Sequence, residues 1–199
     1  MNTNIIKKPL FILYILVLLY ICMILLFGNL KFIIFDDFLH TIFNPHIFFI
    51  FNVLGMYPLI FLLAIKVYLI DIKDQAYKLL HLSYLFGGFI IYPILLTTSL
   101  TSKGKIRETK YINIIFIVLS AYTLFLLFYV ELFGDFSYFL YMFKYDILIH
   151  IMTIDFIITY IFSIYLSYKK EKNWYLSFIP VLGFLFLLNS SAFIIHNKS

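Results

Sequence analysis

Charged residues are scarce in this chain. Only 13% of its 199 residues are charged, about half of the usual share in soluble proteins, whereas 64% are hydrophobic. A soluble domain of this size needs a charged surface to stay in solution, and its interior is too small to bury so many apolar side chains. The composition therefore excludes an ordinary soluble domain and predicts a protein embedded in lipid.

Cysteine is almost absent, with Cys22 alone inside the first apolar run. One cysteine cannot form an intramolecular disulfide, so the sequence does not indicate a redox compartment. The residues before it, Leu19, Tyr20 and Ile21, are too large for a lipoprotein processing site. We interpret Cys22 as a packing residue.

Catalytic signatures are also lacking. The sequence contains no HExxH, Walker, GxSxG or CxxC motif, so it assigns no catalytic residue and no cofactor. The formal net charge is +5, but the basic residues lie in short clusters between apolar runs. Such clusters are typical of orientation by the positive-inside rule and of contact with anionic headgroups. We therefore expect membrane lipids, and no nucleic acid, as partners.

Six stretches are long and apolar enough for a spanning helix, which needs about 20 residues. They cover residues 10–28, 46–70, 79–100, 111–133, 145–168 and 175–195. The sequence therefore predicts an all-α polytopic transmembrane helix bundle of about six helices, in a single integral membrane domain over 1–199. The first stretch is interpreted as a retained helix rather than a signal peptide, because its apolar core is long and no small-x-small cleavage site follows it.

Two features interrupt this pattern. Residues 31–43 are too polar to span, and they predict one short amphipathic helix lying in the membrane interface. Pro180 lies inside the sixth stretch and should kink that helix, because proline has no backbone N–H to donate.

The basic clusters give conflicting predictions of orientation. With six spans, the clusters at 103–110 and 169–172 fall on one face, which their charge would place in the cytoplasm, whereas Lys7 and Lys8 fall on the other. The orientation therefore stays open. An even number of spans places both termini on the same side.

Asp155 is the most informative polar residue. It lies about ten residues into the fifth stretch, close to mid-membrane at 1.5 Å per residue. A carboxylate there costs about 2.5–3.5 kcal/mol on insertion scales, so it must face the bundle, pair or take up a proton. The expected hydrogen-bond partners, at similar depth in the fourth stretch, are Ser120, Tyr122 and Thr123. Two interpretations stay open: a proton or cation site, and a structural hydrogen bond.

A second polar face of the fifth stretch carries Asp146 and His150, which are four residues apart and should touch along the helix. Because this face lies roughly 100° or more from Asp155, the helix should be central in the bundle. Counting spans places four more groups on the face of His150: His81, Glu131, Asp135 and His196. Such a gathering can bind a metal, although interfacial histidines that cap helices explain it as well.

Asp36, Asp37 and His40 form an Asp-Asp-x-x-His pattern, which the span count places on the opposite face. On a helix, both carboxylates approach His40. The group suits a divalent ion, or a phosphorylated lipid headgroup held through such an ion. The solvated side of an amphipathic helix explains the pattern equally well.

Three short motifs carry a resemblance to a family. They are Asn52-x-x-Gly55-x-Tyr57-Pro58, then Phe86-Gly87-Gly88 to Tyr92-Pro93, then Phe143-x-x-Asp146 to His150-Ile-Met-Thr-Ile-Asp155-Phe. Over about residues 48–170 the chain resembles a family of small multi-pass membrane proteins from cyanobacteria, plastids and other bacteria, which has no assigned activity. The resemblance implies a bacterial cell membrane location. The positions to which it directs attention are Asn52, Gly55, Pro58, His150 and Asp155.

Three classes of function follow. The first is a non-enzymatic accessory or assembly component that packs with a membrane-protein partner. The second is a small proton-coupled or lipophilic-solute carrier with Asp155 as its coupling group. The third is an intramembrane enzyme acting on a lipid or isoprenoid through the Asp36–His40 group, or through His150 and Asp155. We rank the accessory protein first, because no complete constellation for chemistry is evident.

Overall fold

The computed structural model describes residues 4–28, 30–36, 38–67, 93 and 110–196. Within these residues the chain is all-helical, with seven α-helices, two short 3-10 helices and no strand. The long helices are α1 (Asn4–Phe27), α3 (Pro45–Val67), α7 (Lys110–Phe133) and α9 (Ile147–Lys170). The shorter elements are η1 (Ile33–Phe35), α2 (Phe38–Ile42), α8 (Phe136–Tyr145), η2 (Trp174–Phe178) and α10 (Leu182–His196). The expected all-α fold is confirmed for these residues, and the expected helix 79–100 lies outside them.

Three of the long helices are long and apolar enough to cross a membrane. The segments concerned are Pro45–Ala64, Ile114–Phe133 and Ile147–Lys169, which agree with the second, fourth and fifth predicted stretches. A helix of this size spans about 30–36 Å, similar to the thickness of a bilayer core. α1 covers the first predicted stretch. Cys22 is exposed on α1, so the interpretation of Cys22 as a packing residue is wrong.

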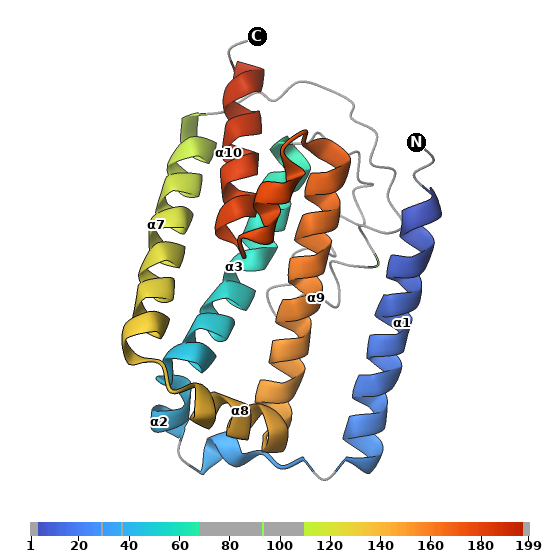
Figure 1. The fold of residues 1–199 in the computed structure, drawn as a ribbon, viewed down its shortest axis with the longest axis vertical. Helices are drawn as coiled ribbons and strands as arrows, with labels where there is room; N and C mark the ends of the chain where they lie inside the picture. Colours follow the sequence, from blue (N-terminus) through green and yellow to red (C-terminus); the bar gives the residue numbers. More distant parts are fainter. Residues whose placement is uncertain (1–3, 29, 37, 68–92, 94–109, 197–199) are drawn as a thin grey trace.

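α3 and α7 pack antiparallel, and two hydrogen bonds fix their alignment. The Tyr122 hydroxyl donates to Oδ1 of Asn52 at 2.6 Å, and the Tyr129 hydroxyl donates to the Phe43 carbonyl oxygen at 3.2 Å. From Tyr122 to Tyr129 the residue numbers rise along α7, whereas the numbers of their bonding partners fall from Asn52 to Phe43, which is the antiparallel arrangement. The end of α3 and the start of α7 consequently lie at the same end of the bundle, where α1 begins and α10 ends (Figure 1). The expectation that the termini share one side of the membrane stays a prediction.

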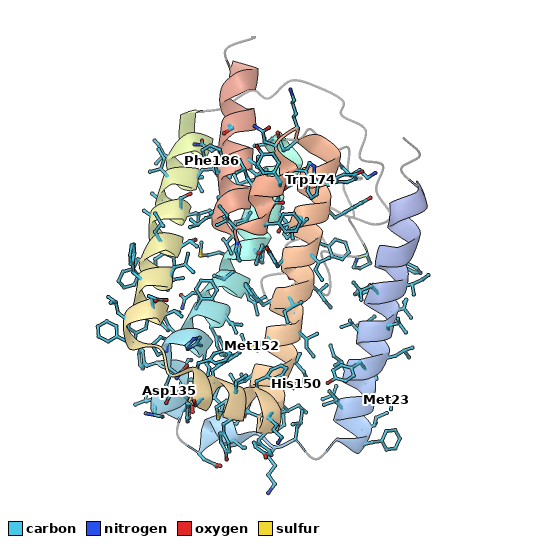
Figure 2. All side chains as sticks on the ribbon, in the orientation of Figure 1. Met23, Asp135, His150, Met152, Trp174 and Phe186 are labelled. Carbon is cyan, nitrogen blue, oxygen red and sulfur yellow. The ribbon has the colours of Figure 1, made fainter. Side chains whose placement is uncertain are left out.

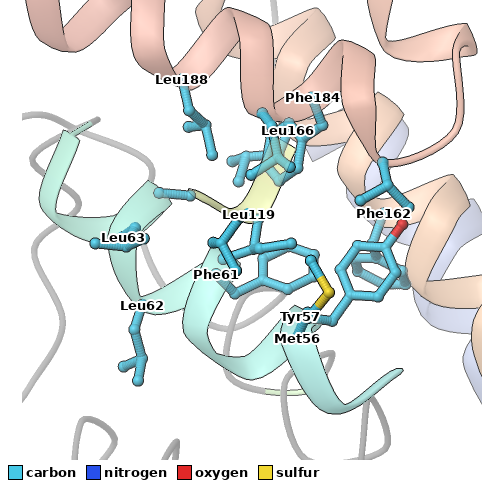
Figure 3. Close-up of a cluster of buried hydrophobic side chains, with 14 of the residues drawn as sticks. Met56, Tyr57, Phe61, Leu62, Leu63, Leu119, Phe162, Leu166, Phe184 and Leu188 are labelled. Atoms are coloured by element: carbon cyan, nitrogen blue, oxygen red, sulfur yellow. The ribbon is translucent and has the colours of Figure 1, made fainter. Parts of the chain in front are cut away.

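The hydrophobic core gathers around α3. The buried cluster combines its side chains with those of four other helices, α1, α7, α9 and α10. Within α3, the rings of Tyr57 and Phe61 stack at 5.8 Å between centroids. Phe184 of α10 lies 5.9 Å from Phe61, and Phe162 of α9 closes the other side (Figure 3). In the apolar window of α3 72% of the residues are buried, against 17% for α7. α3 is therefore the central helix and α7 an outer one.

The sixth predicted stretch is not one helix, and that prediction is wrong. After α9, the chain turns back as η2, bends at Pro180 and Val181, and rises again as the 15-residue α10. We name residues 171–196 the C-terminal hairpin. It runs back along the upper half of α9, because the Tyr160 hydroxyl donates to the Phe178 carbonyl oxygen at 2.6 Å. The expected proline kink is in fact a reversal of the chain.

Local sequence explains the reversal. Pro180 has no N–H for a helix that would continue from η2, and Val181 takes φ 63°, the left-handed conformation that ends a helical path. Gly183 lets the two arms meet, since a Cβ there would collide with the Leu176 carbonyl oxygen. The apolar side chains that follow are fully buried in the core at Phe184 and Leu185. The hairpin is therefore anchored by packing rather than left on the surface.

The predicted amphipathic helix over 31–43 is also divided. Its residues form η1 and α2, and Lys31 pairs with Asp146 in an isolated parallel β-bridge. The Lys31 N–H donates to the Tyr145 carbonyl at 3.0 Å, and the Ile147 N–H donates to the Lys31 carbonyl at 2.9 Å. These bonds hold the segment against the elbow between α8 and α9, so it cannot continue as one helix.

Charge divides the bundle into two ends, which we name the basic end and the acidic end. The basic end carries Lys7, Lys8, Lys66, Lys110, Lys169, Lys170 and Lys172 near the helix termini that meet there (Figure 1). The acidic end carries Asp36, Glu131, Asp135 and Asp146, with Lys31 and Lys144. The prediction that Lys7 and Lys8 lie opposite the 169–172 cluster is wrong. It assumed one crossing between the second and fourth stretches, whereas antiparallel α3 and α7 bring their adjoining ends together.

Candidate functional site

Asp146 is fully buried and joins α9 to η1 at the acidic end. It is the N-cap of α9, where Oδ1 accepts the Ile149 N–H at 2.9 Å. Its Oδ2 accepts the Ile34 N–H at 2.7 Å, across 112 residues of sequence. The carboxylate thus satisfies two backbone donors that would otherwise be buried without partners. The predicted side-chain contact with His150 is wrong, because the cap turns the carboxylate toward these amides instead.

His150 joins α9 to α1. Its Nδ1 lies 2.8 Å from the Phe143 carbonyl oxygen, and its Nε2 lies 2.9 Å from the Tyr20 hydroxyl. A carbonyl can only accept, so Nδ1 carries the proton, and Nε2 of the neutral ring accepts from Tyr20. The Phe143 ring stacks on the imidazole at 4.5 Å and 13°. Figure 2 shows His150 on the side of α9 that faces α1. Both ring nitrogens are therefore used in holding the fold.

Asn52 joins the central helix to α7. Its Nδ2 donates to the Phe48 carbonyl oxygen at 2.8 Å, and its Oδ1 accepts the Tyr122 hydroxyl at 2.6 Å. The resemblance directs attention to this position, and the structure places it in a contact between helices. Its amide oxygen is the acceptor in that contact, while its N–H₂ bonds within α3.

Asp155 is 5% exposed in the middle of α9. The Tyr14 side chain of α1 lies within electrostatic reach of its carboxylate. Two of the predicted hydrogen-bond partners of Asp155 are wrong. The Tyr122 hydroxyl donates to Asn52, and the Thr123 hydroxyl donates to the Leu119 carbonyl of its own helix. α7 packs on α3 and α10. Asp155 therefore belongs to the α1 side of the bundle.

α9 carries polar groups on two sides and packs against several elements, as the sequence predicts. Its neighbours are α3, α8, α10, η1 and η2. The hydroxyls of Thr153, Thr159 and Ser167 are buried, and each donates to a carbonyl four residues earlier on the same helix. Two hydroxyls in the core behave differently. The hydroxyls of Tyr57 and Tyr165 are buried and have no hydrogen-bond partner among the described residues.

The Asp36–His40 group lies at the same end as His150, so the prediction of opposite faces is wrong. Asp36 ends η1, and His40 lies on α2, where its ring packs edge-on against Tyr138 at 5.0 Å. Asp37 lies outside the described residues. His196 ends α10 at the basic end, which also corrects its predicted place beside His150. Within the described ranges, no three His, Cys, Asp or Glu residues are grouped to hold a metal ion.

Sequence reasoning missed a groove between α7 and α10, of about 450 Å³. Its lining residues are Phe116, Ile117, Ser120, Ala121, Leu124, Leu182, Phe186 and Asn189. Apart from two polar side chains the lining is apolar. The Asn189 amide forms no side-chain hydrogen bond with any other residue that the structure describes. A lone Asn in the apolar run of the sixth stretch was the signal that could have identified it.

A second pocket lies at the acidic end, between α2, the start of α3, the end of α7 and the start of α8. We name it the acidic-end pocket. Its volume is about 400 Å³, and its lining residues are His40, Phe43, Asn44, Pro45, Tyr129, Phe133, Asp135 and Tyr138. Figure 2 places Asp135 at the turn from α7 into α8. Of the residues that the sequence analysis singled out, His40 and Asp135 belong to it.

No family model, curated protein or solved structure matches the chain. The resemblance of its three motifs to a membrane-protein family therefore stays a prediction, and the function has to be argued from the geometry.

Proposed function

We propose that the chain is a multi-pass integral protein of the bacterial cell membrane, and that it acts as a non-enzymatic accessory component which docks on a helix of another membrane protein. The observation that carries the proposal is the unpaired Asn189 amide in the outward groove between α7 and α10.

Membrane insertion is supported by the arrangement of charge and aromatic residues. Apolar helices of spanning length connect a basic end with an acidic end. At the basic end, the Lys169 ammonium lies 5.4 Å from the Tyr168 ring centroid, and Trp174 packs edge-on against Tyr168 at 5.2 Å. Such aromatic and basic residues are typical of the level of the lipid headgroups. The positive-inside rule then places the basic end in the cytoplasm, together with both termini.

The groove has the features of a helix-docking surface in lipid. Small residues let two helices approach closely, and Ser120 and Ala121 lie in its α7 wall. Asn189 lines the groove together with α7 residues between Phe116 and Leu124, which belong to the apolar segment Ile114–Phe133, and we therefore place it at membrane depth. An amide that faces lipid leaves its hydrogen-bonding groups unsatisfied, at a cost of several kcal/mol. A partner helix with a polar side chain at this depth would remove that cost.

The polar residues inside the bundle support the same conclusion. Three of them form hydrogen bonds between different elements, and these bonds hold the helices in place: Asp146, His150 and Asn52. A bundle whose internal polar groups are paired, with an outward groove that holds the unpaired Asn189 amide, is the arrangement expected of a component that presents a surface. The partner chemistry is a transmembrane helix that offers a hydrogen-bonding side chain to Asn189.

Native mass spectrometry of the protein extracted gently from its own membrane tests this proposal. We expect a stoichiometric membrane-protein partner with the unaltered chain and its loss with Asn189→Leu, which fills the groove with an apolar side chain. Ser190→Ala is the matched control, because the Ser190 hydroxyl donates to the Phe186 carbonyl of its own helix. A chain that carries no partner, or a partner that persists in Asn189→Leu, would overturn the proposal.

A second candidate, the proton-coupled carrier, is favoured by Asp155. Its carboxylate is buried eight residues after the start of α9, roughly 12 Å along the helix, and it faces Tyr14 of α1. A buried carboxylate between two helices is the kind of group that couples protons to movement. Under this alternative, Asp155→Asn abolishes pH-dependent solute uptake while the protein still folds. Uptake that does not change would exclude it.

A further inference from the structure

The acidic-end pocket has a composition that suits a cation. We propose that it binds an alkylammonium group, carried either by an aminated lipid headgroup or by a free amine. The proposal rests on the pocket itself and is independent of docking at Asn189. It assigns a ligand to residues outside the polar groups of α9.

Phenylalanine and tyrosine rings form half of the pocket lining. Tyr129 and Phe133 come from α7, Tyr138 from α8, and Phe43 from the junction between α2 and α3. The negative face of an aromatic ring attracts an ammonium group within about 6 Å of its centroid, and several rings around one cation form the usual cage for quaternary ammonium ligands. The volume of about 400 Å³ falls within the range of small-molecule pockets.

The rings are held in place before any ligand arrives. The Tyr129 hydroxyl donates to the Phe43 carbonyl at 3.2 Å, and its ring lies 5.7 Å from that of Phe133. On the opposite side, the Tyr138 hydroxyl lies 2.7 Å from the Thr41 hydroxyl. A cage that is already ordered loses little side-chain entropy when it binds.

Asp135 supplies the counter-charge. As the N-cap of α8, it uses Oδ1 to accept the Tyr138 N–H at 3.0 Å, which fixes the carboxylate at the pocket. No lysine or arginine lines the pocket. At the same end Glu131, Asp36 and Asp146 outnumber Lys31 and Lys144, so the net charge around the pocket is negative and favours a cation. A phosphate or a carboxylate is therefore the wrong ligand for this site.

The position of the pocket suits a lipid headgroup. It lies where α3 begins and α7 ends, at the boundary of the apolar segments Pro45–Ala64 and Ile114–Phe133. Phe43 and Phe133 are more than half exposed, so the pocket opens to its surroundings. In a bilayer this is the depth of the headgroups. The ammonium of an aminophospholipid would therefore reach the cage without leaving its leaflet.

Titration calorimetry on the full chain, in a detergent without amines, tests this proposal. The ligands are tetramethylammonium chloride and ethanolamine, and sodium chloride at the same concentration is the reference. We expect saturable binding of the amines, weakened at least about threefold by Asp135→Asn. Asparagine is as good an N-cap as aspartate, so this variant removes the charge and keeps α8. Phe133→Leu, which removes one ring, should weaken binding by a similar factor.

Glu131→Gln is the matched control, because Glu131 carries the same charge at the same end but does not line the pocket. Binding that does not saturate, or that falls equally in Glu131→Gln and Asp135→Asn, would overturn the proposal in favour of general surface charge. A lipid arm identifies the source of the ligand. If the unaltered chain retains phosphatidylethanolamine over phosphatidylglycerol in native mass spectrometry and Asp135→Asn does not, the ligand is a headgroup. Amine binding without such retention identifies a free amine.

Discussion

Asp146 and Asp135 form a matched pair that measures how much the buried carboxylate stabilises the bundle. Both are N-caps whose carboxylate accepts the amide three residues later. Loss of a cap costs about 0.5–2 kcal/mol. Only Asp146 also accepts the N–H of Ile34, a residue with no exposed surface. A hydrogen bond to a charged acceptor contributes about 1.5–3 kcal/mol, and a buried donor left without a partner costs a similar amount.

We therefore expect Asp146→Ala to lower the free energy of unfolding by about 2–5 kcal/mol, and Asp135→Ala by about 0.5–2 kcal/mol. Asp146→Asn should cause an intermediate loss of the free energy of unfolding. Its amide oxygen can still accept the Ile149 N–H at the cap, but its N–H₂ group would face the Ile34 N–H, which is also a donor. Unfolding can be followed in mixed micelles by SDS titration, with Trp174, the single tryptophan, as the fluorescent probe. Equal losses in the two alanine variants would refute the role assigned to the Asp146–Ile34 bond.

Two further pairs test the core and the hairpin. Gly183→Ala should prevent the C-terminal hairpin from closing, because the new Cβ collides with the Leu176 carbonyl oxygen. Gly55→Ala in α3 should be tolerated, because its new Cβ meets nothing within 4 Å. Thermal unfolding of both purified variants would show whether this contrast holds. Tyr57→Phe removes a buried hydroxyl that has no hydrogen-bond partner, so we expect an unchanged or slightly higher free energy of unfolding. Tyr122→Phe removes the 2.6 Å hydrogen bond to Asn52 and should lower the free energy of unfolding by about 1 kcal/mol. A larger loss in Tyr57→Phe than in Tyr122→Phe in the same SDS titration would contradict this assignment.

Length and apolar content were sufficient to predict the long helices. α3, α7 and α9 agree with the second, fourth and fifth predicted stretches to within a few residues, because a run of about 20 apolar residues has few other stable conformations in lipid. The same criterion failed at the sixth stretch, whose average composition does not reveal a change of direction. That change depends on Val181 and Gly183 together with Pro180, and on packing against α9 that no local pattern encodes.

The polar residues were easier to find than to pair. Asp155, His150 and Asn52 stood out because polar groups in apolar runs are costly. The hydroxyls that bond to His150 and Asn52, those of Tyr20 and Tyr122, come from other helices, and span counting placed these helices wrongly. Because the end of α3 and the start of α7 lie at the same end of the bundle, the span count reversed every later element, which moved the acidic-end residues to opposite faces and separated basic clusters that lie together. Charge alone would have signalled the error, since Lys7 and Lys8 conflicted with the clusters after the third and fifth stretches.

The central claim is a membrane bundle whose basic end faces the cytoplasm, and accessibility of single cysteines tests it most directly. In a Cys22→Ser background, Ser137→Cys on α8 and Lys172→Cys in the C-terminal hairpin place one thiol at each end, and both positions are exposed. Intact cells are treated with a maleimide that does not cross the membrane. We expect labelling of Ser137→Cys in intact cells, and of Lys172→Cys only after the cells are permeabilised. Labelling of both thiols in intact cells, or the reverse pattern, would contradict the account.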